Sequence, residues 1–566
     1  MEKFKDLQYI RPDMKETENA LKKQLHAFSS ASTYAEAKEA FLKRQEIINH
    51  FATMMVLASI RANMNTLDEF YRGEEDYFNT VTPQLNVVQK EFNEAFANGK
   101  FRPEFTAEYG EQIFRLIDAD IRTNDESIVG EQIEEAKISS DYMRTAASCK
   151  TEFRGEECNF YGLLKHMLSN DRQERKEAMM AWADLYESAS ANLDDQYAKL
   201  CQLRRTEAEK LGFDSYIDMA YMIHHRFDYN ADDIASFRES VRKYIVPTAV
   251  KIHEAQAKRL GVEKLEYYDE NMAYPNGNST PDKDRQGMVD AAQKMYRELS
   301  PETGEFFDFM VEHELFDLET RPGKHLGGYC TDLMDYKAPF IFSNFNGSSA
   351  DTQVLTHEAG HAFEGYVAAR CQPLTEYEFS TSEVNEIHSM GMEFFTDPWY
   401  DLFYPEGDGD RYRYEHLASS LENITYLVCV DEFQHRVFEG EQPDAAGLRA
   451  IWKDIEQKYL PWRSYDGNEF LENGGFWMQK QHIFLYPFYY VDYALAMLCA
   501  MQFYLRMRKD REEAWNSYLK LCRLGGSLGY FDLLKEAGLK NPFKEETIRE
   551  VTEGVMEVID ELEKSI

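Results

Sequence analysis

Helical periodicity runs almost unbroken through residues 1–300, and it constrains the fold more than any other feature of the sequence. Apolar residues recur at helical spacing in residues 34–64 and again in residues 229–260. Thr33 precedes the first stretch and Asn230 can cap the second, and both are residue types that begin helices. The sequence therefore predicts helix packed on helix over this region.

One short region departs from this pattern. Residues 318–348 contain short apolar runs broken by Gly, Pro and Asp, which predicts a small β-sheet. Residues 150–161 contain a Gly and mixed polarity, which predicts a turn between helical subregions, and residues 269–282 have loop composition. The predicted fold class is mainly α with one small sheet, in which helices pack around a groove and not on a doubly wound parallel sheet.

The chain is strongly acidic, with 63 Lys and Arg against 101 Asp and Glu, for a net charge of −38. Such a field repels polyanions and anionic membrane surfaces, so we expect no nucleic-acid and no membrane partner. The N-terminal residues show no apolar segment of a secretory signal, and none of the eight cysteines forms a CxxC pair. We therefore expect a cytoplasmic protein with reduced, mostly buried thiols.

Residues 483–505 are apolar and long enough to span a bilayer. They also contain Pro487, several tyrosines and a central Asp492, and a charged group in mid-membrane is costly. We interpret the segment as a loop followed by a buried helix.

Residues 357–361 read HEAGH, which is the HExxH pattern. On a helix, His357 and His361 lie on one face, so both imidazoles can reach one ion at about 2.0–2.1 Å, the zinc–nitrogen distance. Glu358 lies beside the first histidine, where it could act as general base for a metal-bound water. Gly360 inside a helix costs about 1 kcal/mol relative to Ala, and it predicts close packing against a neighbouring element.

A catalytic zinc site usually has three protein ligands and a water, so a third donor is required. The longer pattern HExxHxxGxxH fails, because Glu364 and Val367 stand at its glycine and third histidine positions. A glutamate from a later helix is the other common solution, and residues 380–383 have the form of a capping box that begins such a helix. Glu386 and Glu393 would lie on one face of it, so one could ligate the metal while the other orients a ligand histidine. Spacing alone does not choose among the candidates. These are Glu364, Glu376, Glu378, Glu383, Glu386 and Glu393.

Further segments accompany the HExxH motif. Residues 386–393 read EIHSMGME, residues 482–493 read HIFLYPFYYVDY, and the strand region contains GYC at 328–330 and FNG at 345–347. With these segments the chain resembles the thimet oligopeptidase and oligoendopeptidase F family of zinc metallopeptidases, on its oligoendopeptidase F and Pz-peptidase side. The resemblance is clear over residues 322–505. The length of the chain and its helical periodicity make the resemblance plausible for the whole chain.

The resemblance implies one zinc ion per chain, held by His357, His361 and Glu386. It implies that Glu358 activates the attacking water, and that the reaction is hydrolysis of internal bonds in short, unstructured peptides. The fold it implies is an elongated multi-helix metallopeptidase with the small sheet beside the HExxH helix and a deep central channel.

The resemblance also implies that side chains of residues 482–493 reach over the substrate. Tyr490, Tyr493 and His482 are the candidates to stabilise the oxyanion of the tetrahedral intermediate. The related thimet peptidases have a glycine-rich loop in this segment, but residues 483–488 contain no glycine, so the same flexible loop is not expected here.

Other residues of this region receive supporting roles. With Glu386 as ligand, Glu393 is left as the carboxylate that orients a ligand histidine. Gly327, Gly328 and Tyr329 could pair backbone to backbone with an extended substrate, or could form an ordinary turn.

We divide the chain into an N-terminal helical region at 1–195, which forms one wall of the channel, and a catalytic region at 196–566. The substrates expected from the resemblance are short peptides. The sequence does not indicate an oligomeric state.

Two other functions remain open. Glu358 and His361 also form an ExxH unit, and Glu432 with His435 forms a second, so a carboxylate-bridged di-iron site is one alternative. A non-catalytic, acidic helical protein that binds peptides or acts as a scaffold is the other. Metal content would distinguish a di-iron protein from a zinc peptidase, and turnover of peptides would distinguish a binding protein from a zinc peptidase.

Overall fold

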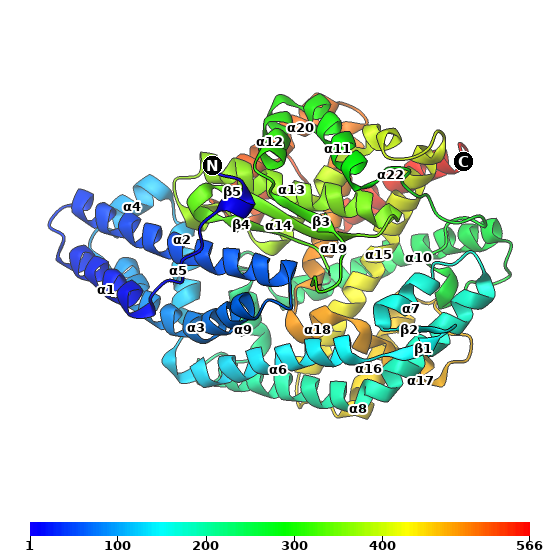
Figure 1. The fold of residues 1–566 in the computed structure, drawn as a ribbon, viewed down its shortest axis with the longest axis horizontal. Helices are drawn as coiled ribbons and strands as arrows, with labels where there is room; N and C mark the ends of the chain where they lie inside the picture. The colour runs from blue at the N-terminus through cyan, green and yellow to red at the C-terminus, as the bar shows by residue number, and fades with distance from the viewer. Residues whose placement is uncertain (326) are drawn as a thin grey trace.

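A three-stranded mixed sheet lies in the upper centre of the molecule, among the helices (Figure 1). Strands β3 (Phe316–Glu319), β4 (Tyr329–Leu333) and β5 (Ala338–Phe345) are arranged in the order β3-β5-β4. β3 runs parallel to β5, and β4 runs antiparallel to it. This confirms the small sheet predicted for residues 318–348, and it makes β4 an edge strand of the described part of the sheet.

The computed structural model describes residues 1–325 and 327–566. Within these ranges β5 leads through a tight turn into α13 (Ser349–Cys371), the helix that contains the HExxH motif. Gly347 in this turn has a φ of +84°, a conformation that glycine adopts without steric cost. The Asp351 carboxylate accepts the Gly347 backbone N–H at 2.7 Å, which ties the turn to the start of the helix. α13 packs along β4 and β5, so the sheet fixes its position.

The N-terminal helices project to the left of the view as a separate arm with its own aromatic core (Figure 1). They are α1 (Met14–Ser30), α2 (Tyr34–Met64), α3 (Glu69–Ala97), α4 (Arg102–Tyr109) and α5 (Gln112–Thr123), and α6 (Val129–Ser148) then runs along the lower part of the molecule. The predicted start of α2 is confirmed, because Thr33 and Glu36 form a capping box there. The buried phenylalanines of this separate core are Phe28, Phe41, Phe92, Phe96, Phe105 and Phe114.

The middle of the chain begins with a hairpin where a simple turn was predicted. β1 (Thr151–Phe153) and β2 (Glu156–Cys158) pair antiparallel around Arg154 and Gly155, which both have positive φ. The following helices are α7 (Phe160–His166), α8 (Arg172–Lys210), α9 (Tyr216–Ile223), α10 (Ala231–Leu260), α11 (Arg285–Leu299) and α12 (Pro301–Glu312). α8 crosses residue 195 as one continuous helix, and the division of the chain at that residue stays a prediction.

The C-terminal part is helical throughout its described elements. After α13 come α14 (Ser382–Phe395), α15 (Asp408–Phe438), α16 (Ala445–Tyr459), α17 (Glu469–Glu472), α18 (Gln481–Leu485), α19 (Tyr490–Met507), α20 (Arg511–Leu524), α21 (Tyr530–Glu536) and α22 (Glu545–Glu563). Short 3₁₀ helices complete the fold at η1 (Phe4–Asp6), η2 (Glu126–Ile128), η3 (Tyr267–Asp269), η4 (Met334–Tyr336), η5 (Thr375–Tyr377), η6 (Asp397–Leu402) and η7 (Gly475–Gln479).

α19 confirms the prediction of a buried helix after a loop. Its Ala494, Leu495 and Leu498 side chains are fully buried, and it packs against α14 and α15. Asp492 is also fully buried, where its carboxylate pairs with Arg226 at 2.7 Å. Among the described helices, none combines the length and apolar character that crossing a membrane requires.

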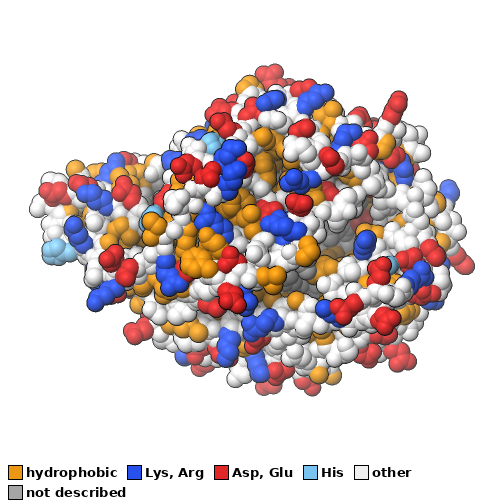
Figure 2. Space-filling view, viewed as in Figure 1, with side chains coloured by type: hydrophobic (Ala, Val, Ile, Leu, Met, Phe, Trp, Pro, Cys, Tyr) orange, Lys and Arg blue, Asp and Glu red, His pale blue; other side chains and the backbone are white. Residues whose placement is uncertain are grey.

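The face seen in Figure 2 is hollowed near its centre, between the upper part with α11 and α12 and the lower part with α8 and α16. Acidic and basic side chains are scattered around this hollow. Two cavities inside the molecule are lined in part by His357 of the HExxH helix.

Candidate active site

Three potential metal-binding atoms converge where α13 and α14 cross. The carboxylate Oε2 of Glu386 lies 3.4 Å from Nε2 of His357 and 3.4 Å from Nε2 of His361. Ligand atoms that bind a tetrahedral zinc ion at about 2.1 Å are about 3.4 Å from one another. The three atoms lie within 4.8 Å of one another, and the carboxylate oxygen has this spacing to both nitrogens, so the group fits a zinc ion that keeps a fourth position open.

Gly360 explains how α14 comes so close to the two histidines. A Cβ at this position would lie 2.6 Å from Cα of Ser389 and 2.7 Å from the carbonyl oxygen of His388. The two helices thus touch backbone to backbone, which confirms the close packing predicted at this glycine. Ser389 is one helical turn beyond Glu386, so this backbone contact holds Glu386 close to the two histidines.

The start of α14 corrects a detail of the prediction. Residues 380–383 do not form a capping box, because the helix begins at Ser382 and the N-cap residue Thr381 makes no side-chain capping hydrogen bond. Glu383 is instead fully buried. Its burial near the Arg226 guanidinium replaces the local capping contact, and burial raises the pKa of its carboxyl.

Glu393 contacts His357 on the side of the ring opposite the candidate metal-binding nitrogen. Its carboxylate accepts hydrogen bonds from Nδ1 of His357 and from Nε2 of His416, both at 2.6 Å. Burial opposes the charged carboxylate, but these two hydrogen bonds outweigh it and lower the pKa of Glu393 to about 2. With Nδ1 of His357 donating to Glu393, Nε2 of that ring is left with a lone pair for a metal. The structure places Glu393 where the predicted orienting role requires it.

Glu386 has two further partners of its own. Tyr489 donates its hydroxyl to Oε1 of Glu386 at 2.5 Å, and Ser389 donates to Oε2 at 2.9 Å. Burial opposes ionisation of Glu386, but the neighbouring imidazoles and their hydrogen bonds hold its pKa well below the ordinary value. These contacts orient the carboxylate toward the histidines.

Sequence reasoning missed Tyr489 and His416. Tyr489 stands next to Tyr490, so its signal was the adjacent tyrosine pair, but the resemblance pointed to the pair three residues apart. His416 lies on α15 and had no local signal, because only the packing of α15 beside α14 brings it to Glu393.

Glu358 faces a cavity of about 320 Å³, which we call the metal cavity, and the three candidate metal ligands also line it. Glu358 is 9% exposed, and burial raises the pKa of its carboxyl above the ordinary value. The cavity is closed on another side by Gly328 and Tyr329. A carboxylate in this position can exchange a proton with a water beside the metal-binding atoms.

Gly328 and Tyr329 place the edge strand of the sheet along the metal cavity. Tyr329 begins β4, and its ring stacks on Phe342 of β5. Gly327 does not line this cavity among the described residues, and its carbonyl oxygen accepts a hydrogen bond from Asn344 at 2.8 Å. Of the three residues predicted to pair with substrate, Gly328 and Tyr329 therefore have the access that this role needs.

His482, Tyr490 and Tyr493 lie together around a second cavity of about 550 Å³, the tyrosine cavity. The His482 ring centroid lies 4.8 Å from that of Tyr490 and 6.2 Å from that of Tyr493. Tyr493 also lines the metal cavity, whereas His482 and Tyr490 do not. Burial, with a smaller effect of Lys480, lowers the pKa of His482 to about 4, and burial raises that of Tyr493 well above its ordinary value. The histidine is therefore neutral at pH 7, and the phenol keeps its proton.

The segment that leads into these tyrosines is held by buried hydrogen bonds. Arg226 donates to the carbonyl of Phe488 at 2.6 Å, and the His224 ring contacts the carbonyl of Pro487 at 2.9 Å. Gln434 accepts the Phe488 backbone N–H at 3.1 Å. These contacts occupy the backbone groups that a mobile loop would present to solvent.

The metal and tyrosine cavities belong to a longer series. They share His357 and Tyr493. The tyrosine cavity shares Gln353 and Glu422 with a cavity of about 760 Å³, and the metal cavity shares Tyr329 with one of about 730 Å³ between α2, α3 and α6. Through these shared residues the four cavities adjoin one another in a row that includes the three candidate metal ligands.

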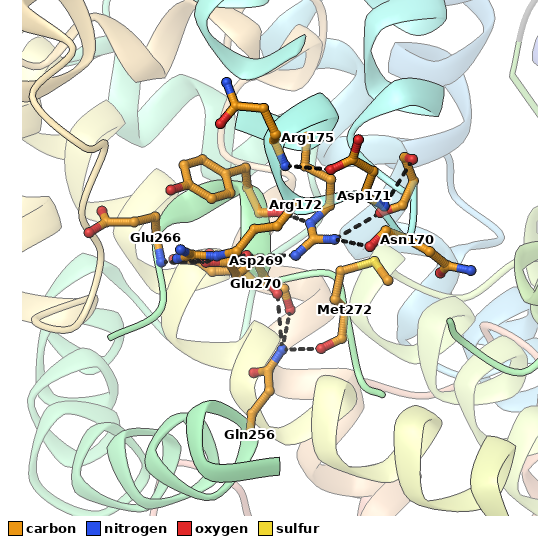
Figure 3. Close-up of polar contacts among 12 residues, drawn as sticks. Asn170, Asp171, Arg172, Arg175, Gln256, Glu266, Asp269, Glu270 and Met272 are labelled. Atoms are coloured by element: carbon orange, nitrogen blue, oxygen red, sulfur yellow. Dashed lines mark hydrogen bonds and ion pairs between the residues drawn. The ribbon is translucent and has the colours of Figure 1, made fainter. Parts of the chain in front are cut away.

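Buried polar contacts hold the backbone of residues 269–272 next to the tyrosine cavity (Figure 3). Asp269 is fully buried and accepts hydrogen bonds from Arg172 at 2.7 Å and from Arg175 at 2.8 Å. Gln256 donates to three backbone carbonyls of residues 269–272, which include that of Glu270 at 2.9 Å. Glu270 lines the tyrosine cavity, so these contacts hold its backbone in place.

The residues of the second ExxH unit, Glu432 and His435, make hydrogen bonds with other side chains. Glu432 accepts hydrogen bonds from Lys458 at 2.8 Å and from Tyr459 at 2.5 Å, and His435 contacts Arg238 and Tyr221, each at 3.0 Å. Over residues 1–325 and 327–566, neither Glu432 nor His435 belongs to a group of three side chains that could hold a metal. The structure therefore offers no support for the di-iron alternative.

Comparisons with known proteins agree with this geometry. A family model described as "Peptidase M3 N-terminal domain" matches residues 4–124, and one described as "Peptidase family M3" matches residues 165–553. The chain is similar to the solved structure of Pz peptidase A with an inhibitor, with a TM-score of 0.96, 42% identity and 100% of both chains covered. It is also 22% identical to an oligoendopeptidase F homolog of Borreliella burgdorferi, over 84% of this chain and 86% of that protein. Oligopeptidase PepF of Bacillus subtilis is 21% identical, over 93% of this chain and 80% of that one.

Proposed function

Because this chain belongs to peptidase family M3, we propose that it is a zinc-dependent endopeptidase that hydrolyses internal bonds of short, unstructured oligopeptides. One observation carries the proposal: the donor atoms of His357, His361 and Glu386 lie within 4.8 Å of one another, and the Glu386 oxygen lies 3.4 Å from each histidine nitrogen, which is the spacing of ligands around a tetrahedral zinc ion. One zinc ion per chain is proposed. When bound, zinc would lower the pKa of a coordinated water and polarise the scissile carbonyl.

The residues around the donors have separate tasks in this proposal. Glu358 accepts a proton from the attacking water and later donates it to the leaving amine. Glu393 holds the His357 ring through its Nδ1–H, and Tyr489 holds the Glu386 carboxylate. Each of these groups is pre-positioned in the folded chain, so little reorganisation is needed at the moment of reaction.

The substrate class follows from the shape of the site. The metal-binding atoms lie within a series of cavities and not on an open surface, which favours extended peptides over folded proteins. β4 presents an edge beside the metal cavity, and an extended peptide can add to such an edge through backbone hydrogen bonds. The eight free cysteines are consistent with a reducing, cytoplasmic location, and the net charge of −38 does not favour nucleic acid.

Purified protein should test the proposal directly. We expect about one zinc per chain by mass spectrometry and cleavage of an internally quenched peptide of about ten residues, with no cleavage of a folded protein that contains the same sequence. A chelator should abolish the peptide cleavage, and added zinc should restore it. Two irons per chain would contradict the proposed metal, and zinc without cleavage of any of a varied set of peptides would favour a binding protein.

Tyr493 is the tyrosine that we expect to stabilise the oxyanion, because it lines both the metal cavity and the tyrosine cavity. Tyr493→Phe should lower kcat by about 10²–10³-fold with little change in KM, the usual cost of removing one oxyanion donor. Tyr490→Phe is the matched comparison and should cost less. Steady-state kinetics on one peptide would decide, and a larger loss for Tyr490→Phe would reverse the assignment.

A further inference from the structure

The tyrosine cavity contains one basic side chain that pairs with no carboxylate. Lys480 lies between η7 and α18 and lines this cavity together with His357 and Tyr493. Over the described residues, its ammonium has no acidic group within salt-bridge distance. Among the described lining residues, the only other Lys or Arg is Arg463, which is bound by the Glu270 carboxylate at 2.6 Å.

Aromatic rings hold the Lys480 ammonium without neutralising it. Its Nζ lies 5.0 Å from the ring centroid of Tyr490 and 5.6 Å from that of Tyr426. Cation–π contacts of this kind orient a cation but leave its positive charge available to an anion. Because Lys480 is only partly exposed, a carboxylate beside it would be attracted more strongly than at an open surface.

The acidic groups of the same cavity do not compensate this charge. Glu270 is bound to Arg463, and Glu393 is bound to His357 and His416. Burial raises the pKa of Glu422 well above its ordinary value, which disfavours its charged form, and its carboxyl group lies 3.5 Å from Nε2 of His253. In a chain with a net charge of −38, an unpaired ammonium inside a cavity is suited to an anionic ligand that enters it.

We propose that Lys480 binds a carboxylate of the peptide substrate in the tyrosine cavity. This inference rests on the proposed peptidase function and adds a specificity determinant to it. The Lys480 ammonium and the His482 ring both lie against the Tyr490 ring, at 5.0 Å and 4.8 Å from its centroid, so a carboxylate bound to Lys480 would lie close to the side chains proposed to face the scissile bond. The carboxylate is either the free C-terminus of the peptide or an Asp or Glu side chain near the cleaved bond.

Three kinds of peptide, each of about ten residues, distinguish these sources. The first contains no acidic side chain and ends in a free carboxylate, the second is its C-terminal amide, and the third is the amide with one Glu placed at successive positions on each side of the cleaved bond. Products are measured by liquid chromatography with mass spectrometry. For the wild type we expect kcat/KM on the free acid, or on one of the Glu-containing amides, to exceed that on the plain amide by about tenfold, mainly through a lower KM.

Variants then assign the preference to Lys480. Lys480→Met should bring the ratio of kcat/KM values close to one, whereas Lys480→Arg, which keeps the charge, should retain most of it. Lys453→Met removes an exposed lysine of α16 that lines none of the four cavities, and it should leave the ratio unchanged. A ratio cancels general damage to the fold, because such damage lowers cleavage of all peptides alike.

The outcomes are separable. A preference that survives in Lys480→Met, or a wild type that cleaves the plain amide as well as every carboxylate-containing peptide, would overturn the inference while leaving the peptidase function intact. A wild type that cleaves none of the peptides would overturn both.

Discussion

Replacing Glu358 by Gln is expected to lower kcat/KM by about 10²–10⁴-fold or more while the zinc content stays at one per chain. The side chain keeps its shape but loses the ability to accept a proton from the attacking water. Glu358 faces the metal cavity but does not belong to the group of side chains whose donor atoms converge, so metal binding should not depend on it. Peptide cleavage and zinc content, measured on the same preparation, test the prediction.

Glu207→Gln is the matched control for this change. Glu207 is also a buried glutamate, but it lies on α8 and lines none of the four cavities. Burial raises its pKa to about 8, so at pH 7 the side chain is mostly protonated and glutamine resembles it closely. We expect wild-type cleavage for this variant. Equal activity of Glu358→Gln and the wild type would refute the role of Glu358 as general base.

The part of the site that follows from local patterns could be predicted from the sequence. The HExxH spacing places His357 and His361 on one helical face, and the structure directs both toward Glu386. Gly360 predicted a close neighbour for the same local reason, since a helix accepts the cost of a glycine where another backbone must approach. Periodicity also predicted the long N-terminal helices and the interruption that became β3, β4 and β5.

Contacts that depend on the crossing of distant elements could not be predicted in this way. The choice of Glu386 over its neighbours came from a family resemblance, because several glutamates had equivalent local spacing. His416 reaches Glu393 only because α15 packs beside α14, and Tyr489 reaches Glu386 only because α19 packs across it. The capping box predicted for residues 380–383 does not form for the same reason. Glu383 is buried by tertiary packing, which outweighs the local contact that the sequence pattern favours.

The segment of residues 483–488, which precedes the tyrosines, was predictable in part from the sequence and in part only from tertiary contacts. Its lack of glycine predicted that a flexible loop would be absent, and the structure supplies the contacts that hold it. Arg226 binds both the carbonyl of Phe488 and the carboxylate of Asp492 on α19. One buried guanidinium therefore ties the segment to the helix that contains Tyr493, so contacts within the core position this part of the chain.

Replacing Glu386 by Gln is expected to lower zinc affinity by at least about 10²-fold and to abolish cleavage at low zinc. Loss of the outer partner of a ligand typically costs 10–100-fold in metal affinity, so loss of a charged ligand should cost more. The Tyr489 and Ser389 hydroxyls can still contact an amide at this position, so the fold should remain intact while the negative charge is lost. Zinc affinity is measured by competition with a chelator, and folding by thermal unfolding of the metal-free protein.

Glu393→Gln supplies the graded comparison, because Glu393 touches His357 without belonging to the group of converging donors. Its loss should weaken zinc binding by about 10–100-fold, which is less than the loss of Glu386, and excess zinc should restore its activity more fully. The order of the two variants tests the assignment of ligand and supporting residue. If Glu386→Gln bound zinc as tightly as the wild type while Glu393→Gln did not, the third ligand would have to be Glu393.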